Sequence, residues 1–106
     1  MSDEISRHLP LTESTSYILM SLAEPKHGYA LMQQVQTMSE GTVKIGPGTL
    51  YTAFGALEQA GLISMVEERD RRKSYALTSK GQQVLKEHVR RTAIMVLAGL
   101  DITRDW

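Results

Sequence analysis

Two short segments whose side chains alternate between the two faces of a strand constrain the fold of this 106-residue chain most. They are Ile63–Glu68 and Ser74–Leu77, and the five residues Arg69–Lys73 separate them. Alternation with a period of two is typical of β-strands, and a short polar interval joins two such strands as a hairpin. Elsewhere the apolar residues follow helical spacing. The sequence therefore predicts one β-hairpin in an otherwise helical chain.

Two helices are predicted near the N-terminus, because apolar residues recur there at helical spacing. The first covers about Thr12 to Ala23, with Thr12 as its N-cap and Pro25 marking its end. The second covers about Gly28 to Ser39, and Gly41 suits its C′ position. The apolar residues at helical spacing in the second helix are Leu31, Met32, Val35 and Met38.

A third helix is predicted over Pro47–Ala60, since proline is favourable at the first position of a helix. It carries no charge until Glu58. The stretch Thr42–Ile45 before it alternates and is a candidate for one further strand. The residues that the third helix would bury are Leu50, Phe54 and Leu57.

A long final helix is predicted from Ser79 to about Leu100, with Thr78 as its N-cap. Its apolar set is wider than one face against a small domain requires. Apolar surface beyond the needs of the core usually marks a partner site. The set comprises Val84, Leu85, Val89, Ala93, Ile94, Met95, Val96, Leu97 and Leu100.

The order helix, helix, short strand, helix, strand, loop, strand, helix is that of a winged helix-turn-helix. In that fold the third helix enters the major groove of DNA, and the loop, or wing, lies along the backbone or minor groove. We therefore predict a mainly α fold with a small β-hairpin wing (α+β). Residues 1–78 would form the winged helix-turn-helix DNA-binding domain, and residues 79–106 a long C-terminal dimerisation helix.

Composition and motifs argue against several functional classes. The chain has no cysteine, which excludes thiol chemistry and fits a cytoplasmic protein. No apolar run approaches the roughly 20 residues of a membrane span, and Met1–Pro10 lacks the apolar centre of a secretory signal. The three histidines lack metal-ligand spacing, and no nucleophile elbow, P-loop or dinucleotide-binding glycine motif occurs. We expect no enzyme activity, no metal and no cofactor.

Charge is distributed unevenly, although the formal net charge is zero. Residues 59–106 hold nine basic and six acidic residues, whereas residues 1–58 hold three and six. Four of the twelve basic residues lie within Arg69–Lys73. A cationic hairpin tip beside an uncharged helix suits a protein that grips the DNA backbone while it probes a groove.

The candidate DNA contacts are the wing cations, residues of the third helix off its buried stripe, and one tyrosine of the second helix. Tyr and Thr hydroxyls suit phosphate oxygens, and a Thr or Ala methyl group can meet a thymine methyl group. The candidates are Tyr29, Thr49, Tyr51, Thr52, Ala53, Arg69, Arg71, Arg72 and Lys73. Other roles stay open: Tyr51 would pack its ring beneath the wing, Tyr29 would be half-buried in the core, and the wing would be a charged, soluble tip whose Arg72 and Lys73 partly neutralise Glu67 and Glu68.

The final helix carries the candidate dimer interface, because residues spaced four and three apart approximate a coiled-coil seam. Dimer packing alone and a ligand pocket within the seam both stay open. Met20 and Met95 would add adaptable apolar surface, and Trp106 would cap such a pocket or fray. The candidate interface residues are Leu85, His88, Val89, Thr92, Val96 and Leu100.

Four ordered blocks carry a resemblance to a known family. They are Lys26–Met32, Gly46–Tyr51, Leu57–Ile63 and Arg71–Gly81. At these spacings they closely resemble the PadR family of bacterial transcriptional regulators, over roughly residues 9–90. The resemblance implies a dimeric winged-helix repressor that a small molecule often releases from DNA. The short C-terminus is similar to the compact subfamily, in which one long final helix makes the dimer.

The chain departs from the family pattern at several positions. Gly55 and Ala56 stand where the third helix of the family typically carries basic residues, and Thr52 stands where proline is frequent. Thr92 aligns with a tryptophan on which some compact members stack planar drugs. The resemblance therefore implies that the wing carries more of the affinity for DNA, and that this chain lacks the tryptophan sandwich.

We expect a sequence-specific DNA-binding transcriptional regulator, a homodimeric repressor acting in the cytoplasm on an inverted-repeat operator. A planar or hydrophobic small molecule would be its inducer. Two other classes stay open: a winged-helix module that binds proteins, and a small-molecule sensor that does not act primarily through DNA. The basic wing favours DNA over the first of these.

Overall fold

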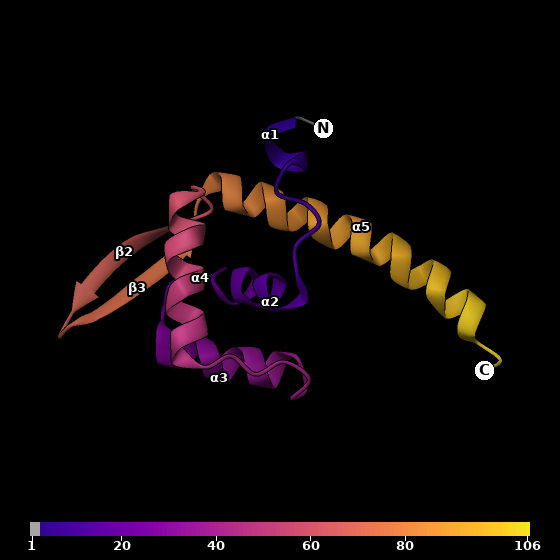
Figure 1. Ribbon diagram of the computed structural model, residues 1–106, viewed down its shortest axis with the longest axis horizontal. Coiled ribbons are helices and arrows are strands. Elements are labelled where there is room, and N and C mark those ends of the chain that lie inside the picture. Colours follow the sequence, from indigo (N-terminus) through magenta and orange to yellow (C-terminus); the bar gives the residue numbers. More distant parts are fainter. Residues whose placement is uncertain (1–2) are drawn as a thin grey trace.

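The computed structural model describes residues 3–106 and confirms a mainly helical fold with one small antiparallel sheet. The helices are α1 (Asp3–Ser6), α2 (Glu13–Ser21), α3 (Gly28–Met38), α4 (Pro47–Gln59) and α5 (Ser79–Thr103). The strands are β1 (Lys26–His27), β2 (Ile63–Arg69) and β3 (Arg72–Leu77). Helices α2, α3 and α4 form a cluster, from which the β2–β3 hairpin points away on one side. Helix α5 crosses the cluster and continues beyond it on the other side (Figure 1).

The sheet has the order β1-β3-β2, and both pairings are antiparallel. Besides the hairpin, the sheet contains β1, in which Lys26 pairs with Tyr75 of β3 and His27 pairs with Ser74. The predicted strand Thr42–Ile45 is wrong, since this stretch is irregular. Its alternation arises because Val43 and Ile45 of this loop are buried, whereas Thr42 and Lys44 are exposed. A two-residue strand such as β1 has no detectable period, so the sequence pattern missed it.

The hairpin closes through a turn of only two residues, Asp70 and Arg71, with φ angles of 51° and 67°. Arg69 and Arg72 pair across the strands on either side of it. Positive φ at both central residues is the requirement of a type I′ turn, which matches the twist of the flanking strands. The predicted five-residue loop is therefore too long, because Arg69, Arg72 and Lys73 belong to the strands.

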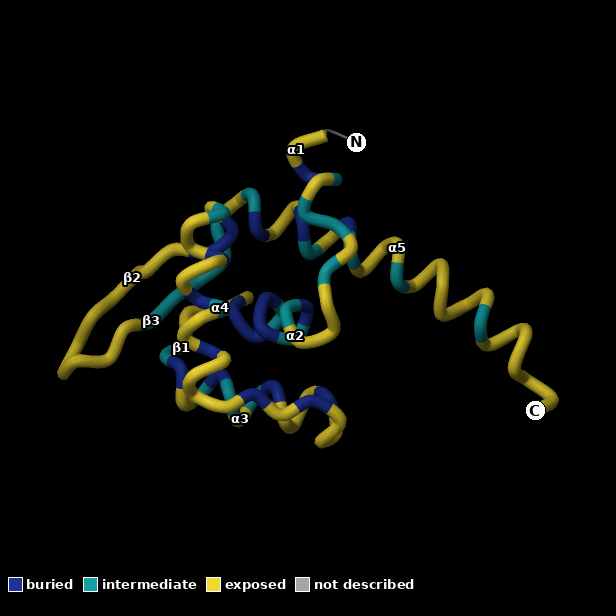
Figure 2. The backbone as a smooth tube through the Cα atoms, viewed as in Figure 1, coloured by how far each residue is buried: buried dark blue, intermediate teal, exposed yellow. Residues whose placement is uncertain are grey.

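The hydrophobic core lies where α2, α3 and α4 meet the base of the hairpin and the first turns of α5. Figure 2 shows buried residues concentrated there, whereas the hairpin tip and the distal part of α5 are exposed. The predicted residues Leu50, Phe54 and Leu57 are all buried. Of the four apolar residues at helical spacing in α3, Leu31 and Val35 are buried and Met32 is partly buried against the core, whereas Met38 is exposed. Met32 lies at the flank of the buried face, and Met38 occupies the last residue of the helix, where the core ends.

The end of α3 differs from the prediction by one residue. Ser39 is the C-cap, Glu40 takes the C′ position with φ of 54°, and Gly41 follows with φ of 79°. The Gly41 N–H donates to the Gln36 carbonyl at 2.8 Å, and the Glu40 N–H donates to the Thr37 carbonyl at 3.1 Å. This is a Schellman motif with Gly41 at C″ rather than at C′.

The join between α4, β2 and α5 depends on close backbone approach. Thr78 caps α5 by accepting a hydrogen bond from the Gly81 N–H, as predicted. A Cβ atom on Gly81 would lie 2.0 Å from the Leu62 carbonyl oxygen, so no other residue fits there without movement. Lys80 donates to the Ala60 carbonyl and forms an ion pair with Glu4, which links α4 and α1 to the start of α5.

The short helix α1 was not predicted. It contains only four residues, of which Ile5 alone is buried in the core. A single apolar residue carries no periodicity, so its burial against α5 is a tertiary contact that local sequence does not reveal.

Candidate nucleic-acid interface

The side of α4 that faces away from the core is exposed and almost uncharged. Thr49, Tyr51 and Thr52 are exposed there, as predicted. Ala53 is instead half-buried and packs against the core. It follows Leu50 by three positions and precedes Leu57 by four, which places it on the buried stripe. The expectation that Ala53 is free to face a ligand is therefore corrected, while its contact with DNA stays untested.

Tyr51 is held at the junction of α4 and α3. Its ring lies edge-on to Phe54 at a centroid distance of 6.2 Å, and its side chain is 60% exposed. A Cβ atom on Gly28 would lie 3.0 Å from the Tyr51 hydroxyl oxygen, so glycine leaves room for the phenol. The aromatic ring that packs between the wing and α4 is Tyr75 of β3, whose ring centroid lies 4.6 Å from that of Phe54. The alternative position for Tyr51, packed under the wing, is therefore wrong.

The N-terminus of α3 presents a second exposed tyrosine beside Tyr51. Tyr29 is 64% exposed, and its hydroxyl accepts a hydrogen bond from the Gln33 side chain at 3.3 Å. The alternative of a half-buried core tyrosine is wrong. His27 is the N-cap of α3, where its Nδ1 atom accepts the Ala30 N–H at 3.4 Å. Sequence reasoning missed this role, because histidine is not a common N-cap.

The wing carries unpaired cations at its tip. Arg69 forms an ion pair with Glu67 at 3.3 Å, so this arginine, rather than Arg72 or Lys73, neutralises the strand carboxylate. Between residues 3 and 106, no ion pair is found for Arg71, Arg72 or Lys73, and all three are exposed. A polar hollow of about 480 Å³ lies between His27 at the base and Arg72 at the tip. Three cations per wing are therefore free to meet a polyanion.

The candidate interface residues of α5 divide into two groups. Leu85, His88 and Thr92 are half-buried against their own protomer, and Leu85 packs on the core. Val89, Val96 and Leu100 are 49%, 48% and 61% exposed. Val96 and Leu100 lie beyond Thr92 on the distal part of α5, whereas Val89 lines an apolar groove between α2 and α5. Only the second group is freely available to another chain.

His88 joins α5 to the N-terminal part of the chain. Its Nδ1 atom accepts the Leu11 N–H at 3.4 Å, and its Nε2 atom lies 2.9 Å from the Ser16 hydroxyl oxygen. The Ser16 hydroxyl in turn donates to the Thr12 carbonyl at 2.7 Å. These contacts suit a neutral imidazole with its proton on Nε2. His88 lies at the rim of an apolar groove of about 410 Å³ between α2 and α5, lined by Tyr17, Met20, Leu85, Val89 and Met95.

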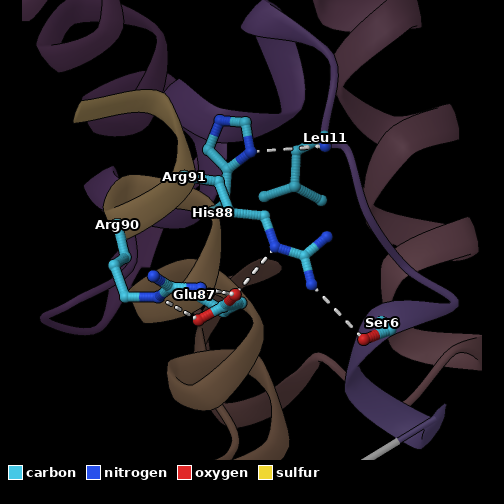
Figure 3. Close-up of polar contacts among 6 residues, drawn as sticks. All are labelled: Ser6, Leu11, Glu87, His88, Arg90 and Arg91. Carbon is cyan, nitrogen blue, oxygen red and sulfur yellow. Dashed lines mark hydrogen bonds and ion pairs between the residues drawn. The ribbon is translucent and has the colours of Figure 1, made fainter. Parts of the chain in front are cut away.

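Sequence reasoning missed a charge cluster on α5, which consists of Glu87, Arg90 and Arg91. Glu87 is only 5% exposed, and its carboxylate accepts two hydrogen bonds from Arg90, both at 2.8 Å, and one from Arg91 at 2.7 Å. Arg91 also donates to the Ser6 hydroxyl of α1 at 3.4 Å (Figure 3). The hydrogen bonds from Arg90 and Arg91 lower the pKa of Glu87 to about 2. The spacing of Glu87 to these arginines is the signal that could have revealed the cluster.

The described part of the chain contains no group of three or more side chains that could hold a metal ion. Across residues 3–106, no helix has the length and apolar character needed to cross a membrane.

Comparison with known proteins identifies a family and a shared fold. Residues 18–87 match the family described as transcriptional regulator PadR-like. The chain is 32% identical over 65 residues to the transcriptional regulator YqjI of Escherichia coli K12, a match covering 61% of this chain and 31% of that protein. The chain thus spans about a third of the length of this relative.

Solved structures of similar fold include a PadR family transcriptional regulator from Eggerthella lenta. Its TM-score is 0.67 at 26% identity, with 85% of this chain and 77% of that chain covered. A structure described as the complex hsRosR-S4 has a TM-score of 0.70 at 23% identity, with 96% of this chain and 98% of that chain covered. The second likeness shows the fold alone.

Proposed function

The chain belongs to the PadR-like family of transcriptional regulators, and on that premise we propose that it is a homodimeric repressor that a small molecule releases from its operator. Members of this family regulate transcription and are not enzymes, and membership implies that DNA is bound. The operator, the dimer, the repression and the release are the proposed parts. The observation that carries the proposal is the set of unpaired cations, Arg71, Arg72 and Lys73, on a hairpin beside the exposed face of α4.

The two DNA-contacting elements would have separate tasks. Helix α4 would enter the major groove with Thr49, Tyr51 and Thr52, and the wing would hold the phosphate backbone with its three cations. Arg69 would contribute less, because Glu67 already pairs with it. Tyr29, at the N-terminus of α3, would donate to a phosphate, and Ala53 would contribute only at the edge of the contact.

The dimer would form through residues 79–106, with residues 1–78 as the DNA-binding domain. Val89, Val96 and Leu100 are exposed apolar side chains that a second copy of α5 would bury, next to Leu85, His88 and Thr92. Gly99 supports this, because apart from its chain neighbours and the nearby backbone of its own helix no atom of the described chain lies within 4 Å of where its Cβ would be. Glycine in a helix costs about 1 kcal/mol relative to alanine, and close approach of another helix is a physical reason to tolerate it.

Two-fold symmetry would then place two α4 helices in successive major grooves of an inverted repeat, about one helical turn apart. The groove between α2 and α5 would receive the inducer, since it is apolar and carries a few polar groups at its rim. A planar or hydrophobic compound fits this lining. Binding there would shift α5 against α2 and so change the spacing of the two α4 helices.

The test measures binding to a labelled duplex that spans the region upstream of the chain's own gene. Three free cations on each of two wings make about six phosphate contacts, so affinity should fall by about 10³ between 50 and 200 mM salt. Arg71→Ala combined with Arg72→Ala should weaken binding at low salt and flatten the salt dependence. Lys86→Ala combined with Arg104→Ala is the matched control, because it removes two exposed cations, one on α5 and one at its C-cap, instead. Salt-insensitive binding, or equal effects of both double variants, would contradict a wing-based grip.

Repression and release require their own measurements. Transcription in vitro from the same upstream region should fall when the protein is added, and a rise would identify an activator instead. A panel of planar hydrophobic compounds, followed by Trp106 fluorescence, should identify ligands that also restore transcription. Compounds that bind without changing transcription would argue against induction through this groove.

A further inference from the structure

Helix α4 has a line of methyl groups on its exposed side. Thr49, Thr52 and Ala56 are three and four positions apart, so their side chains follow one another along the helix. All three are exposed, in contrast to Leu50, Phe54 and Leu57, which α4 buries. We call Thr49, Thr52 and Ala56 the methyl ridge. Glu58, the penultimate residue of α4, is the only charged side chain on this helix.

The chemistry of this ridge selects one base rather than another. Guanine is most often read by arginine or lysine, and α4 has neither residue. Thymine presents a methyl group in the major groove, which apolar contact with alanine or the threonine methyl group can recognise. The nearby arginines and lysine lie on the wing instead, where they are suited to contact phosphates rather than guanine.

Gly55, next to the ridge, favours close approach of α4 to DNA. It is exposed in the interior of α4, and apart from its chain neighbours and the nearby backbone of its own helix no atom of the described chain lies within 4 Å of where its Cβ would be. Intramolecular packing therefore does not require glycine at this position, although glycine destabilises a helix relative to alanine. A missing side chain here lets the backbone of α4 move nearer to base edges.

We propose that the methyl ridge reads thymine 5-methyl groups, so that each operator half-site places thymines beneath Thr49, Thr52 and Ala56. This inference rests on the proposed DNA-binding function and adds the base that is read, the groups that read it and the residue Ala56. Recognition depends on methyl-to-methyl burial rather than on the threonine hydroxyls. Base specificity then resides in α4, and affinity resides largely in the wing.

The experiment removes the thymine methyl group without altering base pairing. Duplexes are first selected with the full-length protein from a randomised library, and deoxyuridine then replaces thymidine at one symmetric pair of positions at a time. Burial of one methyl group corresponds to a change of about fourfold in affinity, so two half-sites should give a loss of about 15-fold at a contacted position. Fluorescence anisotropy at one fixed salt concentration measures this loss of affinity.

Variants of Thr52 separate the methyl group from the hydroxyl group. Thr52→Val keeps a methyl group in place and should preserve the preference for thymidine over deoxyuridine at one position. Thr52→Ser keeps the hydroxyl and should lower that preference to near one. Thr42→Ser, in the loop before α4, is the control and should leave every preference unchanged.

Gly55→Ala should raise the thermal stability of the protein and weaken specific binding at least tenfold.

The outcomes distinguish this inference from the function on which it rests. Selected duplexes without thymines in each half-site would overturn it, as would a Thr52→Ser variant that keeps the full preference for thymidine. In both cases the salt-dependent binding lost in the Arg71 and Arg72 double variant would still support DNA binding. Failure to bind any duplex would refute the proposed function itself, and the inference with it.

Discussion

Arg71 at the tip of the wing combines a free positive charge with a backbone conformation that arginine seldom adopts. Its φ angle of 67° lies in the left-handed region, next to Asp70 at 51°. The left-handed conformation costs a residue with a Cβ atom about 1 kcal/mol or more, and aspartate accepts it more readily than arginine does. A sequence optimised for the turn alone would place glycine at position 71. The arginine indicates that charge at the tip matters more than local stability.

Replacing Arg71 with glycine separates these two properties. Arg71→Gly should raise the free energy of unfolding by about 1 kcal/mol, because glycine adopts positive φ without strain. The same variant should make the slope of log affinity against log salt less steep by about 2, since the proposed dimer loses two phosphate contacts. Urea unfolding and anisotropy titrations measure the two effects.

Arg71→Lys is the matched variant, because it keeps both the charge and the strained backbone. It should unfold like the unchanged protein and retain the full salt dependence. An Arg71→Gly protein that binds DNA with an unaltered salt slope would show that position 71 does not contact phosphate.

Among the elements, α5 has two different parts. Its first turns are fixed to the cluster by Val84, by Gly81 against Leu62, and by His88 against Ser16. The Glu87 cluster adds a hydrogen bond from Arg91, which is paired with Glu87, to the Ser6 hydroxyl of α1. Beyond Thr92 the helix carries exposed apolar residues and makes no polar contact with α2, α3 or α4 among the residues that the structure describes. Helix α5 therefore consists of an anchored half, up to Thr92, and a projecting half after it.

The anchored half of α5 should make stability depend on acid. Arg90 and Arg91 lower the pKa of Glu87 from its ordinary value of 4.5 to about 2. A lowered pKa in the folded state stabilises the protein above the unfolded pKa, and this contribution disappears as pH falls towards the folded value. The stability contributed by Glu87 should therefore be complete above about pH 5.5 and decline steadily between about pH 5 and pH 2.

Urea unfolding of the protein and of Glu87→Gln, at several pH values between 6 and 3, measures this dependence. The difference between the two proteins should be largest near neutral pH and should shrink with acid. Glu13→Gln is the control, because Glu13 is exposed on α2 and forms no ion pair within residues 3–106. A difference that stays constant over the whole range would exclude Glu87 as the titrating group.

For the whole molecule, the shape itself suggests an assembly. The principal extents are 53 × 34 × 20 Å, and the long dimension follows the projecting half of α5. Exposed apolar side chains on this half include Ile94, Met95, Val96, Leu97 and Leu100. A projecting helix with apolar residues on all sides is usually buried in another chain. The proposed dimer accounts for this surface.

Two substitutions on the projecting half test the dimer. Val96→Asp with Leu100→Asp removes four buried apolar side chains from a dimer, so the dissociation constant should rise by at least 10³-fold. Sedimentation equilibrium measures it, and circular dichroism should still report a folded protomer, because neither residue belongs to the core. Lys86→Glu, on the anchored half, should leave the association unchanged. A double variant that sediments like the unchanged protein would place the interface elsewhere or exclude it.

The sequence by itself determined the order of the long helices and the hairpin, the cap at Thr78 and the buried stripe Leu50–Phe54–Leu57. These features follow from periodicity and capping, which act between residues a few positions apart. The family resemblance was also visible in the sequence, since its four blocks are local. The wing was correctly placed as a basic hairpin tip, although its turn is shorter than the pattern indicated.

Only the tertiary structure decided which of these residues are free to act. It paired Arg69 with Glu67 and left Arg71, Arg72 and Lys73 exposed. It also added β1 to the sheet, buried Ile5 of α1 and connected His88 to Leu11 and Ser16. Most of these features depend on contacts between residues far apart in the chain. The pairing of Arg69 depends on which of several neighbouring charges its side chain reaches. Such contacts leave no periodic signal in the sequence.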